Sequence, residues 1–219
     1  MKSDPPQGTD ARVLACAASQ RALADDMSTL TDDQVRRPSL LPGWSVGHVV
    51  THLCRNADAF ARMIDGARRG EVVAMYPNGR EGRAADIEAG ADRCAAEIIA
   101  DLTSAMARLD DAFSQCTELG WSGAGLTVVG EIRIVDMPAR RRAEVEIHRV
   151  DLGLGYTVAD WPDDFVRAEL DRLRGLWASR QPMGLAQLPR AALVLTPNER
   201  LAWLAGRLVV DGLHPAGVL

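Results

Sequence analysis

The 219-residue sequence lacks the features of several common protein classes. It has no run of eighteen apolar residues and no apolar N-terminal stretch behind a basic segment, so neither a membrane span nor a secretion signal is predicted. Its net charge of −5 comes from mixed acidic and basic residues, which gives no field to attract nucleic acid or an anionic membrane surface. We therefore expect a cytoplasmic protein whose partners are small molecules.

Familiar catalytic motifs are missing as well. The sequence has no Gly-x-Ser-x-Gly nucleophile setting, no phosphate-binding glycine loop and no dinucleotide fingerprint, so hydrolase and nucleotide chemistry are not predicted. The few cysteines are widely separated and never form a Cys-x-x-Cys pair, which favours reduced core thiols over disulfides or a closed metal site. They are Cys16, Cys54, Cys94 and Cys116.

Histidine is also rare, but three of the four histidines fall in two helical segments. Glu144 and His148 are four residues apart, so a helix places both side chains on one face, one turn apart. His48 and His52 form a second pair with the same spacing, about a hundred residues upstream. Helices that brought these pairs together would form a metal chelate.

The spacing of apolar residues predicts four substantial helices before residue 155. Glycines between the third and fourth of them favour a long crossover, Gly120 to Ile134, with a short extended piece. Four helices with one crossover indicate a four-helix bundle, whose core commonly holds metal ligands. The expected helices run from Val13 to Met27, from the capping residue Ser45 to Gly66, from Ile87 to Cys116, and from Pro138 to Gly153.

The remaining chain predicts a small appended domain. A helix is expected around Phe165 to Trp177, a strand over 191–195, and a second helix from the capping box at Thr196 to Val210. We therefore predict a mainly α protein, with a metal-binding four-helix bundle over residues 8–155 and a small α/β C-terminal domain over residues 160–219.

His52, Glu144 and His148 make the favoured ligand set. Two neutral imidazoles and one carboxylate suit zinc or a similar divalent metal, and they leave a fourth position for water or a substrate atom. A structural zinc site would be closed by cysteines, whereas Cys54 points about 200° away from His52 around its helix. An open position predicts catalysis.

Three other residues compete for these roles. Glu146 is two residues from both Glu144 and His148 and so falls on the opposite face of the helix. Asp151 follows His148 by three residues and could orient its imidazole from outside the metal shell. His48 lies at a helix start, where it could cap the helix or hydrogen-bond the preceding loop.

Two stretches resemble the signature segments of the mycothiol-dependent maleylpyruvate isomerase family. They are Leu-Pro-Gly-Trp-Ser-Val-Gly-His-Val-Val-Thr-His-Leu and Arg-Ala-Glu-Val-Glu-Ile-His-Arg-Val-Asp-Leu-Gly, and their order and separation also match. The resemblance covers roughly residues 10 to 155 and implies a DinB-like bundle in which His52, Glu144 and His148 bind zinc. It also implies mycothiol as the thiol cofactor and cis-trans isomerisation of maleylpyruvate as the reaction.

The segment Leu-Ala-Trp-Leu-Ala-Gly-Arg resembles the family's C-terminal Ala-Gly-Arg segment, although the strand region before it is abbreviated. This resemblance implies that Arg207 faces the active site and binds a substrate carboxylate. The alternative is a helix-end arginine that satisfies carbonyl groups. Arg140, Arg141 and Arg142 are weaker candidates, and their run is more typical of a solvated helix face.

Three functions follow from these features. The first is a zinc- and mycothiol-dependent isomerase that adds a thiolate, allows bond rotation and then eliminates the thiolate. The alternative is a mycothiol S-transferase that conjugates electrophiles for detoxification or natural-product assembly. A non-enzymatic zinc-dependent regulator is less favoured, because such proteins need a closed cysteine-containing site. We expect a monomer or a weak homodimer.

Overall fold

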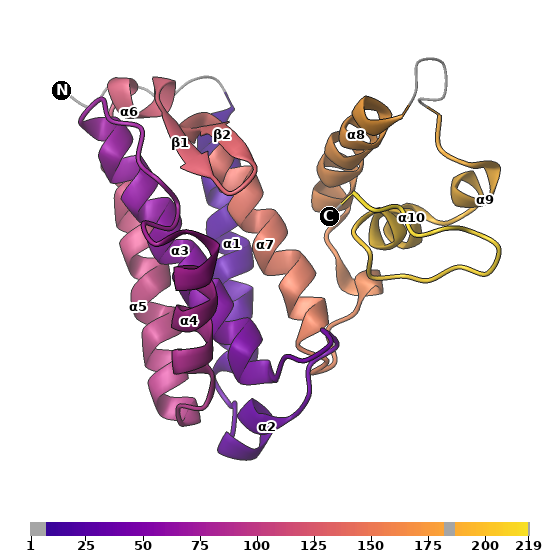
Figure 1. The fold of residues 1–219 in the computed structure, drawn as a ribbon, viewed down its shortest axis with the longest axis horizontal. Helices are drawn as coiled ribbons and strands as arrows, with labels where there is room; N and C mark the ends of the chain where they lie inside the picture. The colour runs from indigo at the N-terminus through magenta and orange to yellow at the C-terminus, as the bar shows by residue number, and fades with distance from the viewer. Residues whose placement is uncertain (1–7, 182–186, 219) are drawn as a thin grey trace. The chain divides into compact units, whose positions relative to one another are not determined.

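The computed structural model describes residues 8–181 and 187–218 (Figure 1). Contacts within the chain divide it into two compact units, Met1–Gly153 and Leu154–Leu219. Each unit has its own buried core and is described by itself.

The first unit is built on four long helices. Helix α3 packs against both α5 and α7, and α1 packs against the same two helices, so the four enclose one core (Figure 1). This arrangement is the bundle that the apolar spacing predicts, and α1, α3 and α7 agree with three of the expected helices. The four are α1 (Thr9–Met27), α3 (Val46–Arg68), α5 (Ala95–Ser114) and α7 (Met137–Asp151).

Helix α3 shows why the sequence folds in this way. Ser45 caps its N-terminus by accepting a hydrogen bond from the backbone of His48, and Gly70 follows its C-terminus with a φ of 75°. Apolar side chains at spacings of three and four are fully buried, each contributing about 1.5–3 kcal/mol. Those with the lowest exposure include Val49, Val50, Leu53, Ala57 and Ile64.

Within the described ranges, no helix is long and apolar enough to cross a membrane.

Shorter elements complete the first unit. Strands β1 and β2 pair antiparallel, with Ala124 opposite Arg133 and Thr127 opposite Gly130, so the predicted extended piece of the crossover is a hairpin. Helix α7 follows it, with Pro138 in its first turn as predicted. The short elements are α2 (Asp32–Arg36), α4 (Gly79–Ala91), α6 (Glu118–Ser122), β1 (Ala124–Thr127), β2 (Gly130–Arg133) and the 3-10 turn η1 (Ile134–Asp136).

The single helix predicted from Ile87 to Cys116 is wrong, because α4 ends at Ala91 and α5 begins at Ala95. Asp32 on α2 caps the second helix from outside, its carboxylate accepting a hydrogen bond of 2.7 Å from the Ala95 backbone N–H. A carboxylate at a helix N-terminus is stabilising. Apolar spacing continues across the break and so does not reveal it.

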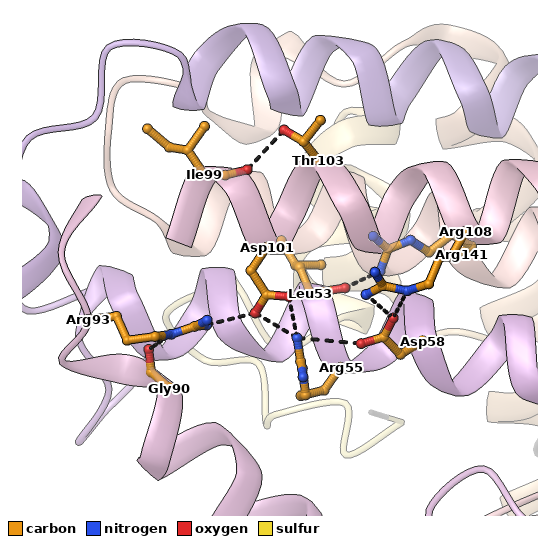
Figure 2. Close-up of polar contacts among 10 residues, drawn as sticks. All are labelled: Leu53, Arg55, Asp58, Gly90, Arg93, Ile99, Asp101, Thr103, Arg108 and Arg141. Atoms are coloured by element: carbon orange, nitrogen blue, oxygen red, sulfur yellow. Dashed lines mark hydrogen bonds and ion pairs between the residues drawn. The ribbon is translucent and has the colours of Figure 1, made fainter. Parts of the chain in front are cut away.

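The face of α3 toward α5 carries a network of ion pairs (Figure 2). Asp101 on α5 binds Arg55 of α3 at 2.5 Å and Arg93 at 2.8 Å. Asp58 on α3 binds Arg108 of α5 at 2.6 Å and lies 3.4 Å from Arg55. Every charge in this cluster therefore faces an opposite charge.

The second unit holds the 3-10 turn η2 (Val158–Asp160) and helices α8 (Asp163–Arg180), α9 (Arg190–Leu193) and α10 (Pro197–Leu204). Helix α10 packs on α8, and Trp203 is buried against Trp177 with ring centres 5.3 Å apart. The capping box predicted at Thr196 is present, with Glu199 as its partner.

Two predictions for this unit are wrong. The strand expected over 191–195 is replaced by α9, because Pro189 precedes alanines that favour helix. Val194 is 85% exposed, and no strand covers it over residues 154–181 and 187–218. The helix expected to reach Val210 ends at Leu204. Gly206 has a φ of 72°, and the Arg207 N–H bonds back to the Ala202 carbonyl, which closes the helix as a Schellman motif.

Candidate metal centre

Helices α3 and α7 bring three predicted ligands together. The His52 Nε2 atom lies 3.0 Å from Glu144 Oε2 and 3.1 Å from His148 Nε2, and the latter two atoms are 3.6 Å apart. One ligand atom from each residue lies within 4.8 Å of the other two. Two nitrogens and one oxygen therefore converge on a single point.

Burial sets the protonation of this group. Desolvation lowers the pKa of His52 to about 4, although its hydrogen bond to Glu144 opposes the shift, so His52 is neutral at neutral pH. Burial disfavours an ionised Glu144, but hydrogen bonds to His148 and His52 outweigh it and hold the pKa of Glu144 well below its usual range. The group therefore offers a carboxylate and a neutral imidazole.

A second carboxylate orients His148. The Nδ1 atom of His148 lies 2.8 Å from Asp151 Oδ2, and the Asp151 side chain is almost fully buried. Burial lowers the pKa of His148, but hydrogen bonds to Asp151 and Glu144 prevail and raise it. A proton held on Nδ1 by Asp151 leaves Nε2 free to act as a ligand, which is the role expected of Asp151.

The other competing residues lie outside the group. His48 completes the α3 cap, its Nδ1 accepting from the Ser45 N–H at 3.2 Å, while its Nε2 lies 3.2 Å from Glu88. Glu146 is buried and accepts hydrogen bonds from Ser19 of α1 and from Arg149. Both placements follow the helical spacing of the sequence.

The cysteines do not complete a metal shell. All four thiols are free, and Cys16 and Cys54 are fully buried. Burial raises the pKa of Cys54 to about 12, so its thiol stays protonated. Among the described residues, the metal-binding group contains no cysteine.

Arg141 corrects the interpretation of the arginine run as a solvated face. It is fully buried, and it donates to the Leu53 carbonyl at 2.9 Å (Figure 2). It also donates to Asn56 at 2.8 Å and to Gln20 at 3.1 Å. Its Nη2 has no hydrogen-bond partner. Arg141 lies one turn from Glu144 on α7, and the two charges interact.

Arg207 belongs to the second unit. Its Nη1 donates to the Ala205 carbonyl at 2.7 Å, which is the contact expected of an arginine at a helix end. Its role toward a substrate stays a prediction.

Sequence reasoning missed three residues beside His52. The Trp44 ring centre lies 5.8 Å from that of His52, and an Arg83 Nη2 atom lies 3.0 Å from His52 Nδ1. The Arg83 Cζ atom is 6.0 Å from the Trp44 ring centre and 5.7 Å from that of Tyr76. Trp44 and Tyr76 lie in loops, and Arg83 lies on the part of α4 before Ile87, where no helix was predicted, so only the tertiary fold reveals this cluster.

Comparisons with known proteins identify the family and the fold of the chain. A family model described as the mycothiol maleylpyruvate isomerase N-terminal domain matches residues 16–153. A crystal structure of a mycothiol-dependent maleylpyruvate isomerase is similar to the chain, with a TM-score of 0.81, 25% identity, and coverage of 91% of this chain and 89% of the other. The crystal structure of a histidine-to-alanine variant of a mycothiol-dependent maleylpyruvate isomerase has the same TM-score and coverage at 24% identity, which shows the fold.

None of the curated proteins compared with the chain matches it significantly. The structural similarity confirms the predicted mainly α, DinB-like bundle. Because the family model covers well over half of the sequence, the chain belongs to the family of the mycothiol maleylpyruvate isomerase N-terminal domain.

Proposed function

We propose that the protein is a zinc- and mycothiol-dependent cis-trans isomerase of maleylpyruvate-like substrates. The observation that carries the proposal is the convergence of His52 Nε2, Glu144 Oε2 and His148 Nε2 on one point. These three residues would hold the metal and would leave a position for a further ligand, as catalytic rather than structural zinc sites do.

The residues present fit such a metal. His52 is neutral at neutral pH, Glu144 is ionised, and Asp151 holds the imidazole of His148 from behind. Zinc sites commonly have a carboxylate that orients a ligating histidine in this way. Neutral imidazoles and one carboxylate also suit other divalent ions, so the donor set supports zinc or a similar metal.

When bound, the metal would supply an open position that holds the thiol as a nucleophilic thiolate, which adds to the cis double bond and leaves after rotation about the resulting single bond. The sulfur that adds is the sulfur that leaves, so the substrate neither gains nor loses electrons. The chain's own residues hold the ligand atoms in place, and buried Arg141 adds positive charge one turn from Glu144. Such charge favours anionic ligands at the site.

The test combines metal analysis with an assay of maleylpyruvate conversion in the presence and absence of mycothiol. Purified protein is expected to contain one equivalent of divalent metal and to convert maleylpyruvate into its trans isomer only when mycothiol is present. His52→Ala should lose both properties, whereas His48→Gln, a change in the same helix outside the group, should keep its metal. A stable mycothiol conjugate without cis-trans conversion would overturn the isomerase in favour of the S-transferase.

A further inference from the structure

Arg83 lies beside the metal-binding group without belonging to it. Its Nη2 is 3.0 Å from the Nδ1 atom of His52, on the side of the ring opposite the Nε2 that faces Glu144 and His148. Trp44 and Tyr76 flank the guanidinium at 6.0 and 5.7 Å, and all three side chains are half-buried. Arg83 therefore remains within reach of a ligand that approaches the site.

The guanidinium has no anionic partner. Over residues 8–181 and 187–218, no carboxylate lies within 4.0 Å of Arg83, whereas Arg55, Arg93 and Arg108 all form ion pairs. The two aromatic rings supply a cation-π attraction, worth about 0.5–2 kcal/mol, and the Tyr76 hydroxyl adds a hydrogen bond to the guanidinium, but neither is an anion. A planar guanidinium is suited to bind a carboxylate through two parallel hydrogen bonds, and here that capacity is unused.

Metal binding by His52 would also leave Arg83 without a hydrogen-bond acceptor on that histidine. A neutral imidazole that binds a metal through Nε2 carries its proton on Nδ1, so Nδ1 becomes a hydrogen-bond donor. Arg83 offers only donors. The two groups then cannot satisfy each other, but one carboxylate can accept from both, since its two oxygens provide several acceptor sites.

The backbone of Arg83 is fixed relative to His52 by close packing of α4 on α3. A Cβ at Gly47 would lie 2.1 Å from the Ala91 carbonyl oxygen, and one at Gly90 would lie 2.6 Å from Thr51. Any larger side chain at these positions would therefore push the helices apart. This contact holds Arg83 beside the metal-binding group.

We propose that Arg83 binds a carboxylate of the substrate and makes the site selective for anionic electrophiles. Trp44 and Tyr76 form the flanking walls, and the His52 Nδ1–H shares the same carboxylate. The inference rests on the proposed function, because it assigns the substrate class of that metal centre.

The test compares Arg83→Gln with Arg83→Lys, using Arg80→Gln as the matched control. Arg80 is an exposed arginine of the same helix, so its replacement removes the same charge away from the site. Three quantities are measured for each protein: metal content, the dissociation constant of zinc-loaded protein for maleate by calorimetry, and kcat/KM with mycothiol. The electrophiles are maleylpyruvate and the uncharged diethyl maleate.

Arg83→Gln should keep its metal, weaken maleate binding about 10- to 100-fold, and lower kcat/KM for maleylpyruvate by a similar factor, mainly through KM. Its rate with diethyl maleate should stay within about twofold of wild type, since an ester lacks the charge that Arg83 recognises. Arg83→Lys should fall between wild type and Arg83→Gln, because lysine keeps the positive charge but lacks the planar pair of guanidinium donors. Arg80→Gln should match wild type.

Two outcomes overturn the inference. If Arg83→Gln loses metal, Arg83 positions His52 instead of binding substrate. If maleate affinity and the preference for maleylpyruvate over the diester are unchanged, Arg83 does not recognise the carboxylate. A wild-type protein that reacts with neither electrophile in the presence of mycothiol refutes the proposed function instead, and maleate affinity alone then decides the role of Arg83.

Discussion

The two faces of helix α3 use charged and polar side chains in opposite ways. Toward α5, Arg55 and Asp58 meet ions of opposite sign, so the network in Figure 2 is closed. Toward α7, His52 meets Glu144 and His148, and one ligand atom from each of the three lies within 4.8 Å of the other two. In the first arrangement each charge lies beside an opposite charge, whereas the second is a set of donor atoms that one metal ion could share.

Helix α3 thus carries ion pairs on one face and a candidate metal ligand on the other. Exposed or half-exposed ion pairs contribute only about 0–1 kcal/mol each, and their loss leaves the fold intact. Lone pairs crowded together at a partly buried site are unfavourable on their own, and proteins keep such arrangements where a ligand makes use of them. Four predictions test this difference between the two faces.

Replacement of the converging residues should have the largest effect. His52→Ala, Glu144→Ala and His148→Ala are each expected to abolish metal binding while leaving the fold largely intact, because two ligands hold zinc far more weakly than three. Elemental analysis and circular dichroism check the two halves of this prediction. Arg55→Ala, on the other face of α3, should keep its metal, and full metal content in any ligand variant contradicts the assignment.

Acid should destabilise the metal-stripped protein because the pKa of His52, on the α7-facing side of α3, is lowered in the folded state. The unfolded chain protonates His52 near pH 6.5, but the folded protein does so only near pH 4, so stability falls as the pH drops through this window. The loss amounts to about 3 kcal/mol. His148 adds no slope there, because its raised folded pKa gives stability that is fully present below pH 6.5 and is lost only at higher pH.

Chemical denaturation between pH 7 and pH 4 measures this effect. His52→Asn removes the titrating group, so the slope between pH 6.5 and pH 4 should flatten in that variant. Below pH 4.5 the depressed pKa of Glu144 adds a further loss as the carboxylate protonates in the unfolded chain. An identical slope in wild type and His52→Asn would show that His52 is not held neutral by burial.

Asp151→Asn should weaken metal binding without abolishing it. The carboxylate that holds His148 Nδ1 at 2.8 Å becomes a neutral amide, and loss of such an orienting group typically reduces metal affinity about 10- to 100-fold. Competition with a chromophoric chelator gives the affinity. Glu88→Gln is the control, because Glu88 contacts His48 outside the group, and an unchanged affinity in Asp151→Asn would remove Asp151 from the site.

Arg108→Ala should have the smallest effect. Arg108 forms an ion pair with Asp58 on the side of α3 that faces α5, and the Arg108 side chain is 52% exposed. The substitution should therefore lower the free energy of unfolding by about 0.2–1 kcal/mol, and by less at high salt. Urea denaturation at two salt concentrations measures it, and metal content should not change. A cost of several kcal/mol would show that the two faces of α3 are not as different as their contacts indicate.

The parts of the site that lie on one helix were predictable from sequence. Glu144, His148 and Asp151 share a face of α7 by spacing alone, and the same spacing places Glu146 on another face. That α3 would meet α7 came from the resemblance to a family, since periodicity reports which face of a helix is buried without naming what covers it.

The remaining features depend on partners far away in the sequence. The break before Ala95 is stabilised by Asp32, and the end of α10 by the left-handed Gly206, neither of which changes the apolar period. Arg83 gained its place from the packing of α4 on α3. Arg141 appeared to belong to a polar helix face, but the bundle buries it, and it donates hydrogen bonds to acceptors on two other helices.

The most direct test strips the metal from the protein with a chelator, restores zinc, and follows maleylpyruvate in the presence and absence of mycothiol. The account predicts cis-trans conversion only when zinc and mycothiol are both present, and no conversion by zinc-treated His52→Ala. Conversion that proceeds undiminished in the stripped protein, or in His52→Ala without bound metal, would contradict it.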